Sequence, residues 1–508
     1  MAEAGSSSRS DVGASGAGAV GSLSGTLRRG AAISTGSLIF TQMVSLAQTL
    51  VLARLLSPAE VGWFAAGTVL SGFLLTFAEG GMSNALVQRE SRLDDVADTV
   101  FWVTLLTGVG WAVVTVASAP LMSRIFGSDT VGLITAVSAG TIVLHALTTV
   151  PDALMQRRFD FRPRLIVQPV VAVTFAVTSV TLCATGFGVW GLVIGSYCSI
   201  VAWLVATWTL AGWRPGAGGR PSFALWREMA RFSLPLVVWT VVNRARDLLE
   251  TAVVGGALST TALGYYRYGR RLGAVPEMAV IAVGSYVLFP AFSRLTGDPE
   301  RFRSAFLRAL QVLWCLMVPV ACFIVAAGEP LVTVLLGEKW RGAGVMLVAL
   351  AGIGPGVALG AIGMESIKGV GRTRLLHWVT LVSTALGIGL LFVLLPLGLT
   401  GVGVALSTSL LAAGLLSLLL ARPLAGVTFG ELAHRLVPLV LVAALPAVAV
   451  GLLEHLLIHS DQRGFLLGTA IMLVEGVGYL GLYAAGLALF APAAWRELSS
   501  AMRQLRHR

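Results

Sequence analysis

Four charged side chains interrupt one of the most apolar stretches of this sequence. Residues 243–250 read NRARDLLE, preceded by FSLPLVVWTVV and followed by TAVVGGAL. A charge at the centre of a membrane helix costs on the order of 2.5–3.5 kcal/mol, whereas a leucine returns only about 0.3–0.6 kcal/mol. Four such charges cannot face lipid, so they must face a wet cavity or one another. The spacing lets Arg246 pair with Glu250 at i,i+4 and Arg244 with Asp247 at i,i+3.

A second basic cluster, RYGRR at 267–271, follows after a short apolar stretch. Arg267, Arg270 and Arg271 are expected to have no acid nearby in the sequence, so they add net positive charge near 243–250. We predict that both clusters line a cavity and give it a positive wall. Two simpler interpretations stay open: the charges of 243–250 only hold helices together, and RYGRR only anchors a helix end among lipid headgroups.

The composition indicates that these segments lie in a lipid bilayer. The chain has 508 residues, 56% hydrophobic and only 12% charged, with a mean hydropathy of +0.84, whereas soluble domains are about one quarter charged. The apolar runs do not alternate and are near the roughly 20 residues that a membrane helix needs. The sequence therefore predicts an all-α polytopic membrane protein with about fourteen transmembrane helices. The predicted spans are 31–52, 61–80, 98–118, 131–150, 165–185, 189–211, 232–257, 261–290, 306–327, 343–363, 375–396, 401–420, 436–456 and 465–490.

The distribution of basic residues predicts the orientation. If the N-terminus is cytoplasmic, most of the 36 basic residues fall on the inner side, as the positive-inside rule requires. Three of the exceptions are the arginines of RYGRR, which this count places on the outer side. Both termini are therefore predicted to be cytoplasmic. The Ser/Gly/Ala-rich residues 1–25 are predicted to be disordered and contain no cleavable signal peptide.

An internal repeat organises the helices. LARLLSPAEVGWF at 52–64 resembles VGGALSTTALGYY at 254–266, and three later blocks match at a slightly larger offset. Each repeat holds six helices, an even number, so two parallel lobes related about the membrane normal are expected to enclose a central cavity, as in alternating-access transporters. The predicted parts are an N-terminal lobe at 26–212, a cytoplasmic linker at 213–231, a C-terminal lobe at 232–420, two extra helices at 436–490 and a basic cytoplasmic tail at 491–508.

The repeat extends the candidate site into the first lobe. At an offset of 202, four of the five polar residues of 243–250 fall on polar residues of the first predicted helix. Spacings of three, four and seven place most of them on one helical face, so we expect this face to line the same cavity. The matched pairs are Asn243 with Thr41, Arg244 with Gln42, Asp247 with Ser45, and Glu250 with Gln48.

Catalytic and metal-binding motifs are not evident in the sequence. The loop SPAE, with Glu60, is too short to carry the acids and bases of an enzyme that acts on lipid-linked sugars, such as a membrane glycosyltransferase or ligase. The pair His455 and His459 lacks the glutamate of an H-E-x-x-H zinc motif, so no cofactor or metal is expected. The cysteines are interpreted as packing residues; they are Cys183, Cys198, Cys315 and Cys322.

Four blocks of sequence resemble a known group of transporters. LARLLSPAEVGWFA, VPDALMQRRFDFR, FPAFSRL and LLGEKW are similar to segments of the Wzx-like oligosaccharide flippases. These proteins belong to the multidrug/oligosaccharidyl-lipid/polysaccharide (MOP) exporter superfamily. The resemblance implies two six-helix lobes plus two extra helices. It also implies transfer of a polyprenyl-diphosphate-linked oligosaccharide from the inner to the outer leaflet of the bacterial cytoplasmic membrane, for polysaccharide or lipopolysaccharide biosynthesis.

The resemblance also implies roles for the charged clusters. In such flippases cationic residues of the central cavity hold the diphosphate, and guanidinium groups suit phosphate oxygens. The candidates here are Arg244, Arg246, Arg267, Arg270 and Arg271, with Asp247 and Glu250 as candidates for proton or sodium coupling. The expected partners are the lipid-linked oligosaccharide and membrane lipids, without nucleic acid. The alternative within the superfamily is a multidrug or cation antiporter, which the excess of basic residues argues against and the two acids keep open.

Overall fold

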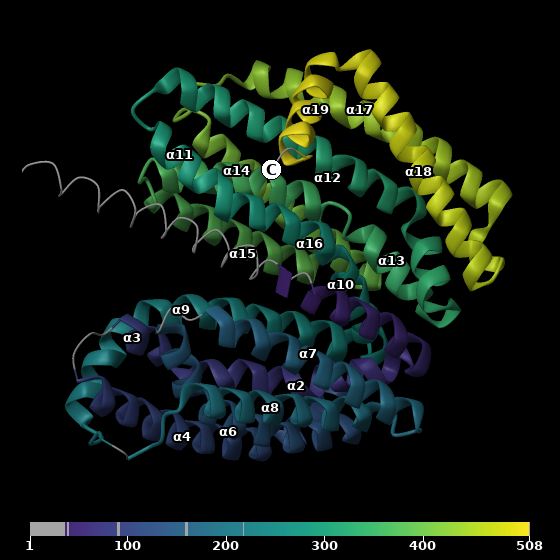
Figure 1. Cartoon of the computed structure of the whole chain (residues 1–508). Coiled ribbons are helices and arrows are strands. Elements are labelled where there is room, and N and C mark those ends of the chain that lie inside the picture. Colours follow the sequence, from purple (N-terminus) through teal and green to yellow (C-terminus); the bar gives the residue numbers. More distant parts are fainter. Residues whose placement is uncertain (1–35, 38–39, 89–91, 158–160, 217, 507–508) are drawn as a thin grey trace, which may run out of the picture. The chain divides into compact units, whose positions relative to one another are not determined.

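A computed structural model shows the arrangement of the helices (Figure 1). It describes residues 36–37, 40–88, 92–157, 161–216 and 218–506. Within these residues every regular element is helical and no strand occurs, which confirms the predicted all-α class. Ten helical segments of the described residues are long and apolar enough to cross a membrane, so the protein is a multi-pass membrane protein.

Contacts divide the chain into two compact units. The first unit comprises Met1–Leu56 and Ala66–Ala252. Within it α7 packs along α8, and α6 contacts both α4 and α8, around a core that includes Leu86 and Val100. Its helices are residues 40–55, α2 (Pro58–Glu79) from Ala66 onward, α3 (Met82–Gln88), α4 (Leu93–Ala117), α5 (Ala119–Phe126), α6 (Asp129–Arg157), α7 (Phe161–Ala184), α8 (Val189–Ala211) and α9 (Phe223–Val253).

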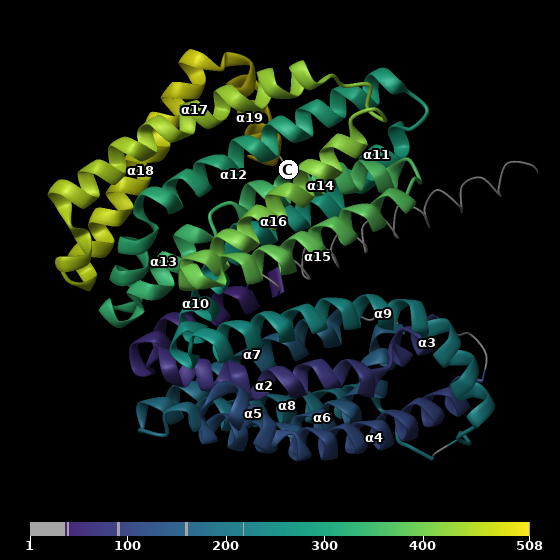
Figure 2. The same ribbon diagram turned by 180° about the vertical axis from the view of Figure 1, so that it is seen from behind.

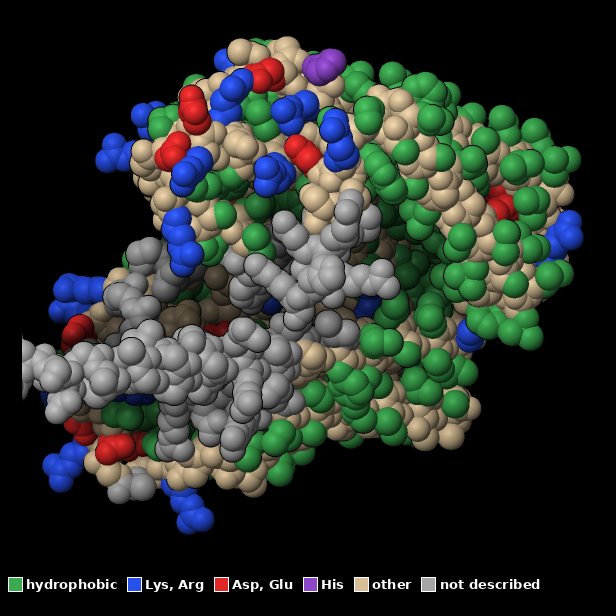
Figure 3. Space-filling view, turned by 45° about the horizontal axis from the view of Figure 1, so that its top comes forward, with side chains coloured by type: hydrophobic (Ala, Val, Ile, Leu, Met, Phe, Trp, Pro, Cys, Tyr) green, Lys and Arg blue, Asp and Glu red, His purple; other side chains and the backbone are tan. Residues whose placement is uncertain are grey.

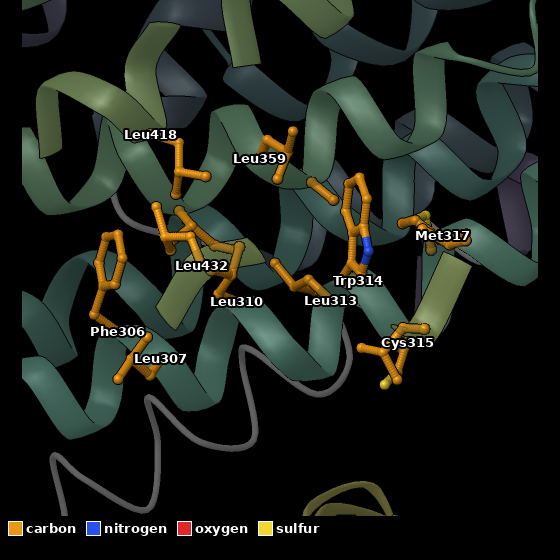
Figure 4. Close-up of a cluster of buried hydrophobic side chains, with 14 of the residues drawn as sticks. Phe306, Leu307, Leu310, Leu313, Trp314, Cys315, Met317, Leu359, Leu418 and Leu432 are labelled. Carbon is orange, nitrogen blue, oxygen red and sulfur yellow. The ribbon is translucent and has the colours of Figure 1, made fainter. Parts of the chain in front are cut away.

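The second unit comprises Ser57–Ala65 and Val253–Arg508. The long helix α12 is at its centre, and Figure 4 shows Phe306 and Leu310 of this helix packed with Leu418 and Leu432. Its helices are η1 (Val254–Leu258), α10 (Thr260–Val283), η2 (Gly284–Leu288), α11 (Phe289–Leu295), α12 (Pro299–Leu336), η3 (Glu338–Trp340), α13 (Arg341–Ala349), α14 (Ile353–Gly369), α15 (Arg374–Leu394), η4 (Leu395–Leu397), α16 (Gly398–Ala421), α17 (Phe429–Leu453), η5 (Glu454–Ile458), η6 (Ser460–Gln462), α18 (Phe465–Phe490) and α19 (Pro492–Arg506).

Within the described residues each of the fourteen predicted spans coincides with helical structure, although the count of fourteen crossings stays a prediction. Residues 1–25, expected to be disordered, and residues 31–35 and 38–39 of the first span lie outside the described residues. The span predicted at 343–363 is divided into α13 and α14 by a break at residues 350–352. α9 and α10 are absent from the ten apolar segments, because each carries the charged residues described above. α15 and α16 form one continuous apolar segment and pack against each other as neighbours (Figure 2).

The beginnings of α2 and α10 mirror each other, as the repeat predicts. The hydroxyl of Ser57 accepts a hydrogen bond from the backbone N–H of Glu60 at 3.3 Å, and that of Ser259 accepts one from Ala262 at 3.0 Å; both serines cap their helices. A Cβ atom on Gly62 would lie 1.7 Å from the carbonyl oxygen of Thr260. Glycine is therefore required at this close approach of two helices.

The equivalent glycine makes the reciprocal contact. A Cβ atom on Gly264 would lie 1.9 Å from the carbonyl oxygen of Pro58, at the start of α2. Two glycines 202 positions apart thus each pack against the first turn of the other's helix. This reciprocity supports the sequence repeat and explains why Ser57–Ala65 groups with the second unit.

Residues 216–222, which connect the two halves of the sequence, are hydrogen-bonded to α4. The backbone N–H of Gly216 donates to Asp98 at 2.9 Å, that of Arg220 donates to Asp95 at 2.9 Å, and that of Ser222 donates to Thr99 at 3.1 Å. α9 begins at Phe223, inside the linker predicted at 213–231, and groups with the first unit. The lobe boundaries drawn from the repeat stay a prediction.

Candidate functional site

The NRARDLLE segment forms the last turns of α9, directly before the π-helical turn η1. Arg246 Nε donates to Glu250 Oε1 at 2.7 Å, which confirms the predicted i,i+4 pair. Glu250 is buried, whereas Asn243, Arg244 and Asp247 are exposed. The segment therefore has one internal ion pair on its buried side and polar groups on its exposed side. The proposed Arg244–Asp247 pair stays a prediction.

One further acid of the first unit interacts with this segment, and a second interacts with that acid. Arg244 attracts the carboxylate of Glu79, at the end of α2, and Asp152 of α6 repels the same carboxylate. Neither acid was singled out in the sequence, although each interrupts an apolar run, in TFAEGG and TVPDAL. The positive charge of Arg244 is therefore partly offset by an acid of α2, which is distant in sequence.

The four polar residues of the first helix have different surroundings. Gln48 is buried, and its Nε2 donates to Ser179 Oγ of α7 at 2.9 Å. The hydroxyl of Thr41 donates to the Ser37 carbonyl at 2.8 Å. Gln42 is exposed, and Thr41 and Ser45 are half-buried. Gln48 thus links two helices of the first unit, whereas Gln42 is accessible for contact with a ligand.

The RYGRR arginines lie in α10, beyond its first turn. The charge count placed them on the outer side of the membrane, but the connection before α10 is Ser259 alone, so they belong to the helix itself. Arg271 is exposed, and Arg267 and Arg270 are half-buried. The ring of Tyr268 stacks on Trp340 with centroids 4.1 Å apart, which fixes that face of the helix against η3.

The expectation that no acid accompanies RYGRR is wrong for Arg270. Its Nη1 lies 3.5 Å from Glu277 Oε2. The two residues are seven positions apart, so they lie on one helical face about 10 Å apart along the axis. Two long side chains bridge that distance, which inspection of immediate neighbours in the sequence does not reveal.

α14, which packs on α10, contains a charged pair that sequence reasoning missed. Lys368 Nζ lies 2.8 Å from Glu365 Oε1, and Glu365 is buried. The visible signal is the pair of charges in GMESIKGV, within an otherwise apolar span. In the second unit both α10 and α14 thus carry compensated charges.

No metal site is found in the described part of the chain. No group of three or more His, Cys, Asp or Glu side chains there is arranged to hold an ion. His455 Nε2 instead lies 3.2 Å from the carbonyl oxygen of Ala326. The four cysteines are free thiols, buried or half-buried.

The arrangement of helices is that of a known class of membrane exporter. The chain is similar to the lipid II flippase MurJ in an inward closed conformation, with a TM-score of 0.66 and 16% identity, over 88% of this chain and 99% of that one. It is also similar to an inward-facing multidrug resistance MATE transporter of the MOP superfamily, with a TM-score of 0.61 and 18% identity, over 76% and 94% of the two chains. These structural similarities show that the chain has the same fold as these two proteins.

The sequence pattern of the family described as "Polysaccharide biosynthesis protein" matches residues 51–344. This is more than half of the chain, so the protein belongs to that family. The resemblance drawn from the sequence blocks is thereby confirmed.

Three named relatives are similar to this chain over part of their length. The succinoglycan biosynthesis transport protein ExoT of Rhizobium meliloti is 27% identical over 65% of this chain and 67% of its own. The lipopolysaccharide biosynthesis protein WzxC of Escherichia coli is 24% identical over 59% and 61%. The teichuronic acid biosynthesis protein TuaB of Bacillus subtilis is 19% identical over 54% and 57%. The matches thus span about two thirds or less of these relatives.

Proposed function

We propose that this protein moves a polyprenyl-diphosphate-linked oligosaccharide from the inner to the outer leaflet of the bacterial cytoplasmic membrane, by alternating access. The product would feed the assembly of a cell-surface polysaccharide, and both termini would be cytoplasmic. Family membership and the names of ExoT and WzxC support this function. The observation that carries it is the arginine-rich composition of α9 and α10 within an otherwise apolar exporter fold.

The contacts rank the arginines as diphosphate ligands. Arg246 is bound to Glu250, and Arg270 lies close to Glu277, so part of their charge is already neutralised. Arg244 and Arg271 have exposed side chains, which suits them to meet an anion that arrives through water. Their planar guanidinium groups can each donate two parallel hydrogen bonds to phosphate oxygens. We assign the main role to Arg271 and supporting roles to the others.

Polar groups of the first unit would contact the sugars or a coupling ion. Exposed Asn243 and Gln42 can exchange hydrogen bonds with hydroxyl groups, as can Thr41 and Ser45. Gln48 would act by holding its helix against α7. Asp247 is the better candidate for proton or sodium coupling, because it is exposed whereas Glu250 is buried against Arg246.

A cation antiporter is the second candidate. Glu79, Asp152 and Asp247 give the first unit several acids in or beside membrane helices, and the MATE transporter shares the fold. Such a protein would bind organic cations at acidic side chains and would not need Arg271. We do not propose an enzymatic activity, because the named relatives are transport and biosynthesis proteins whose roles fit transfer of a finished lipid-linked product.

The decisive experiment measures where the lipid-linked glycan resides. A strain that lacks the protein should accumulate the intermediate in the inner leaflet, and the wild-type protein should restore it to the outer leaflet. Arg271→Ala should not restore it at equal membrane abundance. Arg301→Ala is the matched control, since Arg301 is an exposed arginine at the start of α12, paired with Asp298 at 3.2 Å. An unchanged outer-leaflet glycan in the deletion strain, with altered resistance to cationic drugs, would favour the antiporter.

A further inference from the structure

The two C-terminal membrane helices contain a pair of glutamates in apolar surroundings. Glu454 opens the π-helical turn η5 at the end of α17, and Glu475 lies in the middle of α18. Hydrophobic side chains cover this side of the second unit (Figure 3). Leu473, Val474 and Val477, beside Glu475 in the sequence, are 65%, 72% and 71% exposed. Neither α17 nor α18 belongs to the repeat that forms the proposed transport site.

The carboxylate of Glu454 has one oxygen with partners and one without. Oε1 accepts hydrogen bonds from the backbone N–H of Ser460 at 2.9 Å and from its hydroxyl at 2.6 Å. Oε2 is buried and has no hydrogen-bond partner, and the residue as a whole is 1% exposed. Buried polar atoms are almost always hydrogen-bonded. The bare oxygen therefore points to a ligand that supplies a donor.

The carboxyl group of Glu475 lies close enough to that of Glu454 to interact with it. Both oxygens of Glu475 are buried without a donor. Two ionised carboxylates in contact, away from water, repel each other strongly, and one of them is then protonated. A protonated carboxyl is a hydrogen-bond donor, and its bond to a carboxylate is short and strong.

Other charged groups on the packed elements are already engaged. Asp461 of η6 and Glu329 of α12 both bind Arg341, at 2.6 and 2.8 Å. His455 of η5 contacts a carbonyl of α12, and Arg463 Nε donates to the carbonyl of Ile458 at 2.7 Å. In the described part of the chain no ion pair joins a cation to Glu454 or Glu475. A proton is the simplest cation that satisfies the pair.

We propose that Glu454 and Glu475 form a proton-binding site, in which Glu475 carries one proton and donates it to Glu454 Oε2. The proton comes from water and no covalent bond other than O–H changes. The asymmetry follows from Ser460, whose backbone N–H and hydroxyl both donate to Oε1 of Glu454 and leave Oε2 to accept from Glu475. The shared proton ties α18 to the turn that ends α17. Its loss as the pH rises leaves two adjacent negative charges, so this turn opens. This inference is independent of the proposed transport function.

Infrared spectroscopy of the full-length protein in lipid nanodiscs tests the site directly. The carbonyl stretch of a protonated carboxylic acid should be present at neutral pH and should disappear from the spectrum of Glu475→Gln. The glutamine amide can donate to Glu454 Oε2, so this variant should fold and insert as the wild type does. Glu365→Gln is the matched control, because Glu365 is a buried acid neutralised by Lys368, and its replacement should leave the band unchanged.

The variant Glu454→Gln and amide hydrogen exchange test whether Glu475 is the residue that carries the proton. In Glu454→Gln the band should remain but shift in frequency, since Glu475 keeps its proton and loses a charged acceptor. Amide hydrogen exchange at residues 459–464 should rise with pH in the wild type, beyond the intrinsic pH dependence of exchange, and lose that excess in Glu475→Gln. A Glu475→Gln spectrum identical to the wild type, or failure of this variant to insert, would overturn the proposal.

Discussion

The charged segments of α9 and α10 compensate their arginines in different ways. In α9 the acid follows within one turn, and Arg246 and Glu250 meet at 2.7 Å, with side chains 25% and 11% exposed. In α10 the acid is two turns away, and Arg270 and Glu277 meet at 3.5 Å, with side chains 37% and 17% exposed. The first pair is the tighter and more buried of the two. We infer that α9 uses its charges mainly to hold structure, whereas α10 keeps more of its positive charge for a ligand.

Breaking the α9 pair should have the largest effect on folding. Arg246→Ala leaves Glu250 buried without its cation, a loss of roughly 2–3 kcal/mol, since the pair is partly exposed and a fully buried pair costs about 3–5 kcal/mol. Membrane abundance of this variant should fall well below that of the wild type. It can be measured by immunoblotting of membranes and by thermal stability in detergent.

The double variant separates pairing from other roles of Arg246. Arg246→Ala with Glu250→Ala removes both charges, so abundance should recover above that of Arg246→Ala alone. Equal losses in the single and double variants would mean that Arg246 stabilises the protein through other contacts, and α9 would then not differ from α10 in the way we infer.

Arg271 should show the opposite pattern, with transport lost and abundance kept. Loss of a charge-assisted hydrogen bond to a phosphate costs about 1.5–3 kcal/mol, which corresponds to roughly tenfold or more in transport rate. Arg271→Lys should restore only part of the activity, because lysine lacks the planar fork. Outer-leaflet glycan, normalised to membrane abundance, is the measurement. Full export by Arg271→Ala would contradict its main role, and full export with all three RYGRR arginines replaced by alanine would leave this motif as an interfacial anchor.

How much of this was predictable depends on the distance over which each constraint acts. Bilayer thickness fixes helix length locally, so apolar runs locate the spans, while the break between α13 and α14 depends on packing. The pair of Arg246 with Glu250 is set by one helical turn and is visible in the sequence. The effect of Arg244 on Glu79 requires two helices to meet. The same holds for Glu454 and Glu475 in the C-terminal pair, which sequence spacing cannot reveal.

The first helix offers a smaller test of which polar groups hold structure. Gln48→Ala removes a buried hydrogen bond to Ser179, so we expect a loss of about 1 kcal/mol in stability. Gln42→Ala should leave stability unchanged, since Gln42 is exposed. Thermal denaturation of both variants checks this. A cysteine at position 42 should also react with water-soluble thiol reagents faster than one at 48, in a background without the four native cysteines.

The smallest effect on stability is expected when the pair of Arg270 and Glu277 in α10 is broken. This result decides whether α9 and α10 use their charges differently. At 3.5 Å and with Arg270 more than one third exposed, the pair should contribute less than about 1 kcal/mol to stability. Arg270→Ala should therefore insert at nearly wild-type abundance, and adding Glu277→Gln should change little. Export should fall less than in Arg271→Ala, because part of the Arg270 charge is already neutralised. If Arg270→Ala instead destabilises the protein as much as Arg246→Ala, and Glu277→Gln rescues it, then the charges of α10 hold structure as those of α9 do. The ligand role would then rest on Arg244 and Arg271 alone.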